Sequence, residues 1–264
     1  MKGPLIARGR TAELFAWGDA QVLKLLHDWC PAHWVSHEVE VGRRLATTNL
    51  PLPRVLAVIG VGGRRGILYE RVDGPSMLDL IAGRPWLASR MAALLAELHV
   101  AIHARPGHGF PRLKEGLERE IGRAADLSPG QKERIVAKLR RLPDGGALCH
   151  SDFHPGQVLL SPRGPVVIDW LTAQCGHPPA DVARTLLLFT VGAAPEPSRL
   201  KRAVIDAMRA LFRRRYLQRY LELSPGVTLA QIEAWRLPIM AARLAEAIPE
   251  ERARLLAAIE EALG

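Results

Sequence analysis

Alternating apolar and polar positions fill the first seventy residues in short runs. They predict strands over residues 4–7, 13–17 and 20–26, with a hairpin turn at Gly18 and Asp19. Residues 34–47 carry apolar side chains at helical spacing, and the prolines that follow end that helix. Two further apolar runs, at 55–61 and 66–72, are joined by Gly62 and Gly63, which predicts a second hairpin.

The pattern changes after Asp73, where apolar residues recur at intervals of three and four, as in a helix that runs through Met91, Leu95 and Ile102. Helical patterns continue over residues 114–141, 201–222, 228–247 and 250–263. One segment interrupts them, since residues 147–170 hold two short apolar runs around a polar loop. We therefore predict an α+β protein with a small β-rich lobe, residues 1–72, and a larger helical lobe, residues 73–264.

Composition narrows the class of protein. The chain is 48% hydrophobic and 24% charged, which is typical of a folded globular protein. Its net charge of +9 suits anionic ligands, but no long basic run or zinc-type spacing indicates a nucleic-acid module. Three widely spaced cysteines and an N-terminal segment without an apolar core favour a cytoplasmic protein that does not enter a membrane.

The most informative chemistry lies in the interrupting segment. Asp152 stands five positions before Gln157, and Asp169 ends the second apolar run. A hairpin between the two runs would bring all three side chains together. Carboxylate and amide oxygens bind Mg²⁺, and a second carboxylate can take the proton of an attacking hydroxyl, so the set predicts phosphoryl transfer. A single aspartate after an apolar run often only caps a turn. The prediction therefore rests on the spacing of Asp152 and Asp169 taken together.

The motifs HSDFHPGQV and VVIDW resemble the catalytic loop and metal-binding aspartate of the aminoglycoside phosphotransferase and choline kinase family. The resemblance implies a bilobal protein-kinase-like fold, with Asp152 as catalytic base and with Asp169 and Gln157 as magnesium ligands. The family usually has asparagine where this chain has Gln157, whose extra methylene shifts the amide oxygen by about 1.5 Å. His150 and His154 are interpreted as residues that shape the loop.

Lys24 is the second candidate group. The chain holds thirty arginines and six lysines, and Lys24 is the only lysine between Lys2 and Lys114. A lysine in a strand commonly faces solvent, but the family's equivalent lysine binds the α- and β-phosphates of ATP and pairs with a helix glutamate. The resemblance favours Glu38 as that partner, with Glu40 as the alternative.

Two further segments contact the nucleotide if the resemblance holds. The turn at Gly9, Arg10 and Thr11 occupies the place of the loop that covers the phosphates, although a plain β-turn explains its composition equally well. Main-chain groups between Glu70 and Val72 occupy the place of the hinge that binds adenine.

These observations predict an enzyme that uses ATP and Mg²⁺ to phosphorylate a hydroxyl of a small molecule, nominally an aminoglycoside. A metabolite kinase acting on a choline-like compound, an amino alcohol or a sugar is the alternative within the class. A regulatory nucleotide-binding protein weakened at Gln157 is the alternative outside it.

Overall fold

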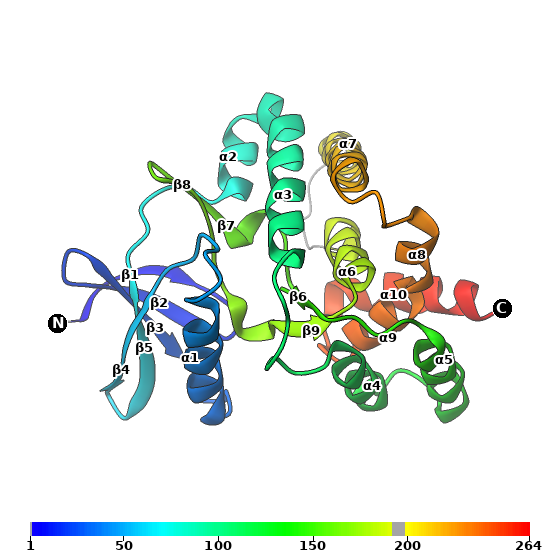
Figure 1. The fold of residues 1–264 in the computed structure, drawn as a ribbon, viewed down its shortest axis with the longest axis horizontal. Helices are drawn as coiled ribbons and strands as arrows, with labels where there is room; N and C mark the ends of the chain where they lie inside the picture. Colours follow the sequence, from blue (N-terminus) through cyan, green and yellow to red (C-terminus); the bar gives the residue numbers. More distant parts are fainter. Residues whose placement is uncertain (1, 192–198) are drawn as a thin grey trace. The chain divides into compact units, whose positions relative to one another are not determined.

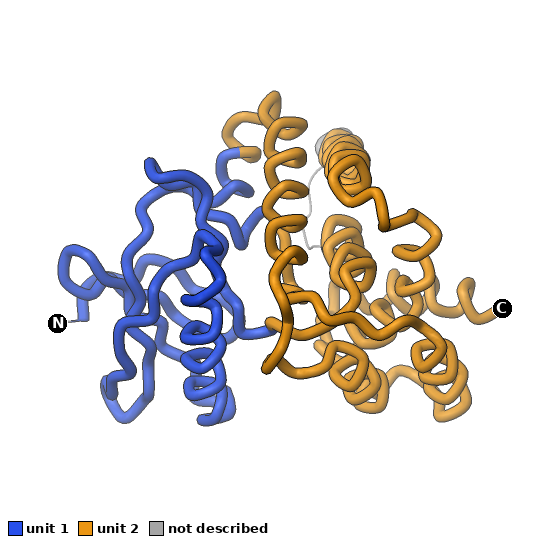
Figure 2. Tube along the Cα trace, viewed as in Figure 1, with its two compact units in different colours: residues 1–80, 155–172 blue, residues 81–154, 173–264 orange. Residues whose placement is uncertain are grey.

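The computed structural model describes residues 2–191 and 199–264, except for the side chains of residues 199–202. The chain divides into two compact units, which Figure 2 colours separately. The first comprises residues 1–80 and 155–172, and the second comprises residues 81–154 and 173–264. The lobe boundary at residue 72 stays a prediction. No helix in the described ranges has the length and apolar character needed to cross a bilayer.

An antiparallel sheet forms most of the first unit (Figure 1). Its strands are β1 (Lys2–Arg8), β2 (Ala12–Trp17), β3 (Gln21–Leu26), β4 (Val55–Val61) and β5 (Arg64–Glu70), in the spatial order β1-β2-β3-β5-β4. Both hairpins predicted from glycine-containing turns are confirmed, since β2 pairs with β3 and β4 pairs with β5. Gly62 and Gly63 adopt positive φ angles of 57° and 79°, which glycine tolerates without strain.

Helix α1 (His33–Leu45) packs on one face of this sheet. Successive strand residues point to opposite faces, so Leu23 and Leu25 lie on one side while Lys24 and Leu26 lie on the other. The α1 side is packed by Ala12, Leu26, Val35, Val39 and Ile67. The opposite side is packed by Phe15, Leu23, Leu25 and Leu68.

A separate hairpin, β7 (Val158–Ser161) and β8 (Gly164–Val167), completes the first unit and confirms the hairpin predicted in the interrupting segment. Main-chain hydrogen bonds attach it to earlier parts of the same unit. Leu160 N–H donates to Pro75 O at 2.9 Å, and Val167 N–H donates to Pro51 O at 2.7 Å. The hairpin therefore delivers Asp169, just beyond β8, to the side of the sheet on which α1 lies.

The second unit is mainly helical. Its helices are α3 (Ala88–His103), α4 (Leu113–Arg123), α5 (Pro129–Arg141), α6 (Pro178–Val191), α7 (Arg199–Leu223), α8 (Leu229–Ala234), α9 (Arg236–Leu244) and α10 (Pro249–Leu263). Helix α2 (Met77–Gly83) spans the boundary between the units, and β6 (Ala147–Cys149) pairs with β9 (Gln174–Gly176). The helical segments predicted over 114–141 and 228–247 are each two helices.

Candidate active site

Lys24 is buried on the α1 face of the sheet, with 8% of the residue exposed. Its Nζ donates to Glu38 Oε1 at 2.7 Å and to Asp169 Oδ1 at 2.9 Å. Burial alone would lower the pKa of Lys24, but the charges of Asp169 and Glu38 outweigh it and raise the pKa. The ammonium is therefore fixed in its charged form between two carboxylates.

Glu38, rather than Glu40, is the partner of Lys24. Val35, Glu38 and Val39 lie at helical spacings of three and four residues on the buried face of α1, so the carboxylate is carried into the core with them. Glu40 faces outward and pairs with Arg44 at 2.9 Å. The contact is confirmed, whereas its part in nucleotide binding stays a prediction.

Gln157 and Asp169 meet at the open end of the β7–β8 hairpin. Ile168 N–H donates to Gln157 O at 2.9 Å, and Gln157 Nε2 donates to Asp169 Oδ2 at 3.4 Å. Asp169 has a φ of 60°, a left-handed conformation that is uncommon for residues other than glycine. Strained backbone of this kind is concentrated at functional sites.

The donor set fits a magnesium ion. Asp169 supplies a carboxylate, and rotation of the Gln157 amide by about 180° presents Oε1 in place of Nε2, so that two hard oxygen donors stand side by side. If Lys24 moved away from Asp169, a divalent ion bound here would replace its positive charge beside that carboxylate. Both assignments as metal ligands stay predictions.

The turn at residues 9–11 links β1 to β2 and is held by its own main chain. Gly9 N–H donates to Ala12 O at 2.8 Å, and His27 N–H donates to Thr11 O at 2.9 Å. The Cys30 thiol also donates to Thr11 O, at 3.2 Å. The turn is thus tied to the residues that follow β3, the strand that carries Lys24. Contact of Gly9, Arg10 or Thr11 with phosphates stays a prediction.

Glu70 ends β5 and holds two arginines. Its carboxylate accepts from Arg54 at 2.8 Å and from Arg163 at 2.7 Å, and these hydrogen bonds lower the pKa of Glu70. Its N–H donates to Arg54 O. Any base contact in this segment must therefore use other main-chain groups up to Val72, and the hinge assignment stays a prediction.

Asp152 lies in the second unit, in the loop that follows β6. Its side chain is 28% exposed, with Oδ1 3.7 Å from Arg184 Nη2 and Oδ2 4.0 Å from His154 Nε2. Its N–H donates to His150 Nδ1 at 3.3 Å, in agreement with a loop-shaping role for that histidine. Because Asp169 and Gln157 belong to the other unit, the convergence of Asp152 with them stays a prediction.

The loop before Asp152 is anchored to α6 through Asp181. His150 N–H donates to Asp181 Oδ2 at 2.6 Å, and Ser151 N–H donates to Oδ1 at 2.9 Å. Ser151 is held at a φ of 64°. The buried carboxylate therefore compensates for a strained turn that fixes the main chain next to the candidate base.

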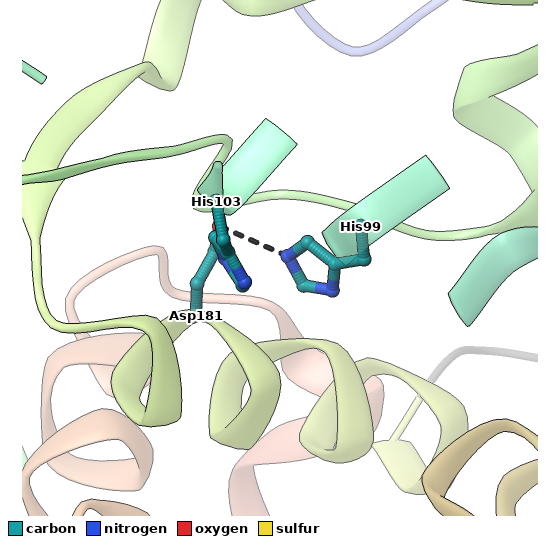
Figure 3. A group of neighbouring side chains, drawn as sticks. All are labelled: His99, His103 and Asp181. Atoms are coloured by element: carbon teal, nitrogen blue, oxygen red, sulfur yellow. Dashed lines mark hydrogen bonds and ion pairs between the residues drawn. The ribbon is translucent and has the colours of Figure 1, made fainter. Parts of the chain in front are cut away.

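Two histidines of α3 complete this anchor, as Figure 3 shows. His99 Nε2 and His103 Nε2 lie 3.1 Å and 3.2 Å from Asp181 Oδ2, while their Nδ1 atoms lie 2.6 Å from Tyr216 OH and 2.7 Å from Tyr220 OH. Three groups of ligand type within 4.8 Å of one another resemble a metal site. Both nitrogens of each ring lie within hydrogen-bonding distance of a protein partner, so the arrangement is explained without a metal ion.

Burial and the interactions within this cluster shift the pKa values of His99 and Asp181. Burial and the neighbouring His103 lower the pKa of His99 to about 4. Burial alone would raise the pKa of Asp181, but its interactions with the two histidines hold it well below its ordinary value. Sequence analysis missed this cluster, although the four-residue spacing of His99 and His103 within an apolar helix face was an available signal.

Arginine and glutamate side chains form a series of ion pairs that begins next to Asp152. Arg184 donates to Glu246, which also accepts from Arg243 at 2.6 Å. Arg243 makes two further hydrogen bonds to Glu251, both 2.7 Å long. Burial alone would raise the pKa of Glu246, but Arg184 and Arg243 lower it to about 2.

Solved structures show which class of fold this is. The chain resembles an aminoglycoside-3'-phosphotransferase of type VIII at 22% identity and a TM-score of 0.60, over 89% of this chain and 90% of that chain. It resembles the GDP and kanamycin complex of APH(2")-IIia at 18% identity and 0.62, over 98% and 90%. The streptomycin and ATP complex of APH(2")-IIa gives 14% identity and 0.58, over 98% and 90%. These likenesses confirm the predicted α+β kinase-like fold.

A comparison of the sequence with family models identifies the family. The model of the phosphotransferase enzyme family matches residues 22–228, so the chain belongs to that family. The matched range contains Lys24, Glu38, Asp152, Gln157 and Asp169, and it begins after the turn at Gly9. No curated protein shows a significant sequence match.

Proposed function

We propose that this phosphotransferase uses ATP and Mg²⁺ to phosphorylate a hydroxyl group of a small molecule. The observation that carries the proposal is the buried Lys24, held at 2.7 Å by Glu38 and at 2.9 Å by Asp169, with Gln157 beside the second carboxylate. A buried lysine that only stabilises the fold needs a single acidic partner. Lys24 is instead shared between Glu38 and a strained Asp169 that also contacts the Gln157 amide, an arrangement suited to exchanging partners with a phosphate and a metal ion.

In this proposal Lys24 binds the α- and β-phosphates while Glu38 keeps its ammonium in place. Asp169 and Gln157 hold Mg²⁺, which neutralises charge on the phosphate oxygens when bound. Asp152 orients the acceptor hydroxyl and takes its proton as the oxygen attacks the γ-phosphorus, while the bond from that phosphorus to the β–γ bridging oxygen breaks and ADP leaves. The anchored His150–Ser151 main chain limits the freedom of Asp152, which lowers the entropy cost of that orientation.

The charges near Asp152 favour a metabolite acceptor over a polycationic one. Both oxygens of Asp152 already face nitrogen groups of Arg184 and His154. Glu246 and Glu251 are engaged by arginines, so neither offers an unpaired carboxylate to an ammonium group. Enzymes that bind polycations need complementary negative charge. We therefore expect a sugar or a singly charged amino alcohol, rather than a polycationic aminoglycoside, as the acceptor.

The test is ADP release by the purified protein with ATP and Mg²⁺, using kanamycin, choline, ethanolamine and glucose as acceptors. We expect acceptor-dependent turnover that is greater with glucose or an amino alcohol than with kanamycin. Binding of ATP and Mg²⁺ without turnover on a wider set of hydroxyl compounds would instead favour a regulatory nucleotide-binding protein.

Asp152→Asn tests the proposed base in the same assay. The substitution keeps the size and polarity of the side chain but removes its basicity, so we expect turnover to fall by about 10²- to 10⁴-fold. ATP affinity, measured by calorimetry, should change little because no nucleotide contact is removed. Unchanged turnover would eliminate Asp152 as the base.

A further inference from the structure

We propose that Tyr69 is a positioning residue for the proposed nucleotide site, one that holds Glu38 so that Lys24 can be shared with a phosphate. The inference rests on the proposed function. Tyr69 OH donates to Glu38 Oε1 at 2.7 Å, the same oxygen that accepts from Lys24 Nζ at 2.7 Å. No sequence motif pointed to Tyr69.

Strand register explains why the two donors reach one oxygen. Ile67 lies opposite Lys24 in the β3–β5 pair, and Tyr69 lies opposite Val22. Residues directly opposite, and those two positions away, share a face of the sheet, so Lys24 and Tyr69 are diagonal neighbours on the face that α1 covers. Glu38 enters between them from α1, and all of these residues belong to the first unit.

The second oxygen of Glu38 shows why the tyrosine matters. Oε2 is buried and has no hydrogen-bond partner among the described residues. A buried carboxylate oxygen without a partner is costly, so Glu38 depends on the two donors at Oε1. When Lys24 turns part of its charge toward a phosphate, Tyr69 remains as a donor and compensates for the weakened ion pair.

Tyr69 is suited to remain a donor. Burial raises its pKa, and the negative charge of Glu38 raises it further, so the hydroxyl keeps its proton throughout the neutral range. Its ring packs against the buried cluster on the α1 side of the sheet, and Val55 lies opposite it in the β4–β5 pair, which fixes the direction of the hydroxyl.

The test is the affinity of Tyr69→Phe for two ligands, MgATP and adenosine, measured by calorimetry and by competition. The variant keeps the ring and loses one hydrogen bond to a charged group. We expect MgATP to bind about tenfold more weakly, because sharing Lys24 now leaves Glu38 underbonded. Adenosine has no phosphates and should bind as it does to the unaltered protein.

Two controls separate positioning from general damage. Tyr220→Phe removes another tyrosine hydroxyl, one that lies 2.7 Å from His103 Nδ1 in the second unit, and should leave MgATP affinity unchanged. In a Glu38→Gln background, Tyr69→Phe should change MgATP affinity by less than about twofold, because the residue through which it acts is already altered.

Three results would overturn the inference: unchanged MgATP affinity in Tyr69→Phe, an equal loss for adenosine, or a full tenfold loss in the Glu38→Gln background. Failure of the proposed function looks different. If the unaltered protein did not bind MgATP, or if Lys24→Met bound it equally well, the nucleotide site itself would be wrong, and the role of Tyr69 with it.

Discussion

At the scale of single residues, the site depends on conformations that side-chain chemistry alone does not reveal. Ser151 and Asp169 adopt left-handed φ angles of 64° and 60°, one beside the candidate base and the other at the candidate metal ligand. Neither is glycine, so each turn stores strain that other contacts must offset. Asp181 does so for Ser151 with a hydrogen bond to its N–H.

Asp169→Ala tests the proposed metal ligand. We expect Mg²⁺ to lose its ability to tighten ATP binding, because the substitution removes the only carboxylate of the proposed pair of ligands. Calorimetric titration with ATP, with and without Mg²⁺, measures the effect. Asp19→Ala alters an exposed carboxylate in the β2–β3 turn and should leave the magnesium dependence intact. Undiminished tightening in Asp169→Ala would place the ion elsewhere.

At the scale of elements, local patterns predicted the strands of the large sheet, the two hairpins at glycine-containing turns and α1. Two helix breaks were missed although their signals are present. Ser128 begins α5 with a capping box completed by Gln131, which identifies a new helix within the segment 114–141. Pro238 lies in the first turn of α9, where proline is tolerated, and a continuous helix over 228–247 would have placed it in the interior.

Pairing between distant elements could not be predicted in the same way. Periodicity shows that a segment is buried, but it does not identify the segment that covers it. Lys24 and Glu38 were paired through the family resemblance. The contact of Tyr69 with Glu38 and the anchoring of His150 by Asp181 depend on register and helix packing, which no local pattern specifies.

Gly74→Ala tests the attachment of the β7–β8 hairpin to the rest of the first unit. Gly74 has a φ of 147°, and a Cβ there would lie 2.2 Å from Leu160 O. We expect a loss of unfolding free energy of about 2–4 kcal/mol in urea titrations, since the main chain must shift. Gly62→Ala, at a φ of 57° with open space around it, should cost only about 1 kcal/mol. Equal losses would show that the contact with Leu160 has no effect.

At the scale of the whole molecule, the first unit is discontinuous in sequence. Residues 155–172 group with residues 1–80, so the chain leaves the first unit after α2 has begun and returns to it for one hairpin. A division of the sequence into two consecutive ranges cannot group residues 155–172 with the first unit. The candidate metal ligand Asp169 owes its contact with Lys24 to this return, and Gln157 owes to it its contact with Asp169.

The buried histidines predict how the stability of the molecule depends on pH. His99 has a pKa of about 4 in the folded protein, below its value of 6.5 in an unfolded chain, so the unfolded state binds more protons between these values. The contribution is therefore fully present above pH 6.5 and is lost as the pH falls toward 4, by about 3 kcal/mol. Urea unfolding at a series of pH values measures it.

His99→Gln isolates this contribution, because the glutamine amide can still donate to Asp181 but does not titrate in this range. The variant should be less stable at pH 7, where the bond to Tyr216 is lost, and its stability should fall less between pH 6.5 and pH 4. His33→Gln, at the exposed start of α1, should keep the slope of the unaltered protein. If His99→Gln also kept that slope, proton uptake on acid unfolding would have to arise from groups other than His99.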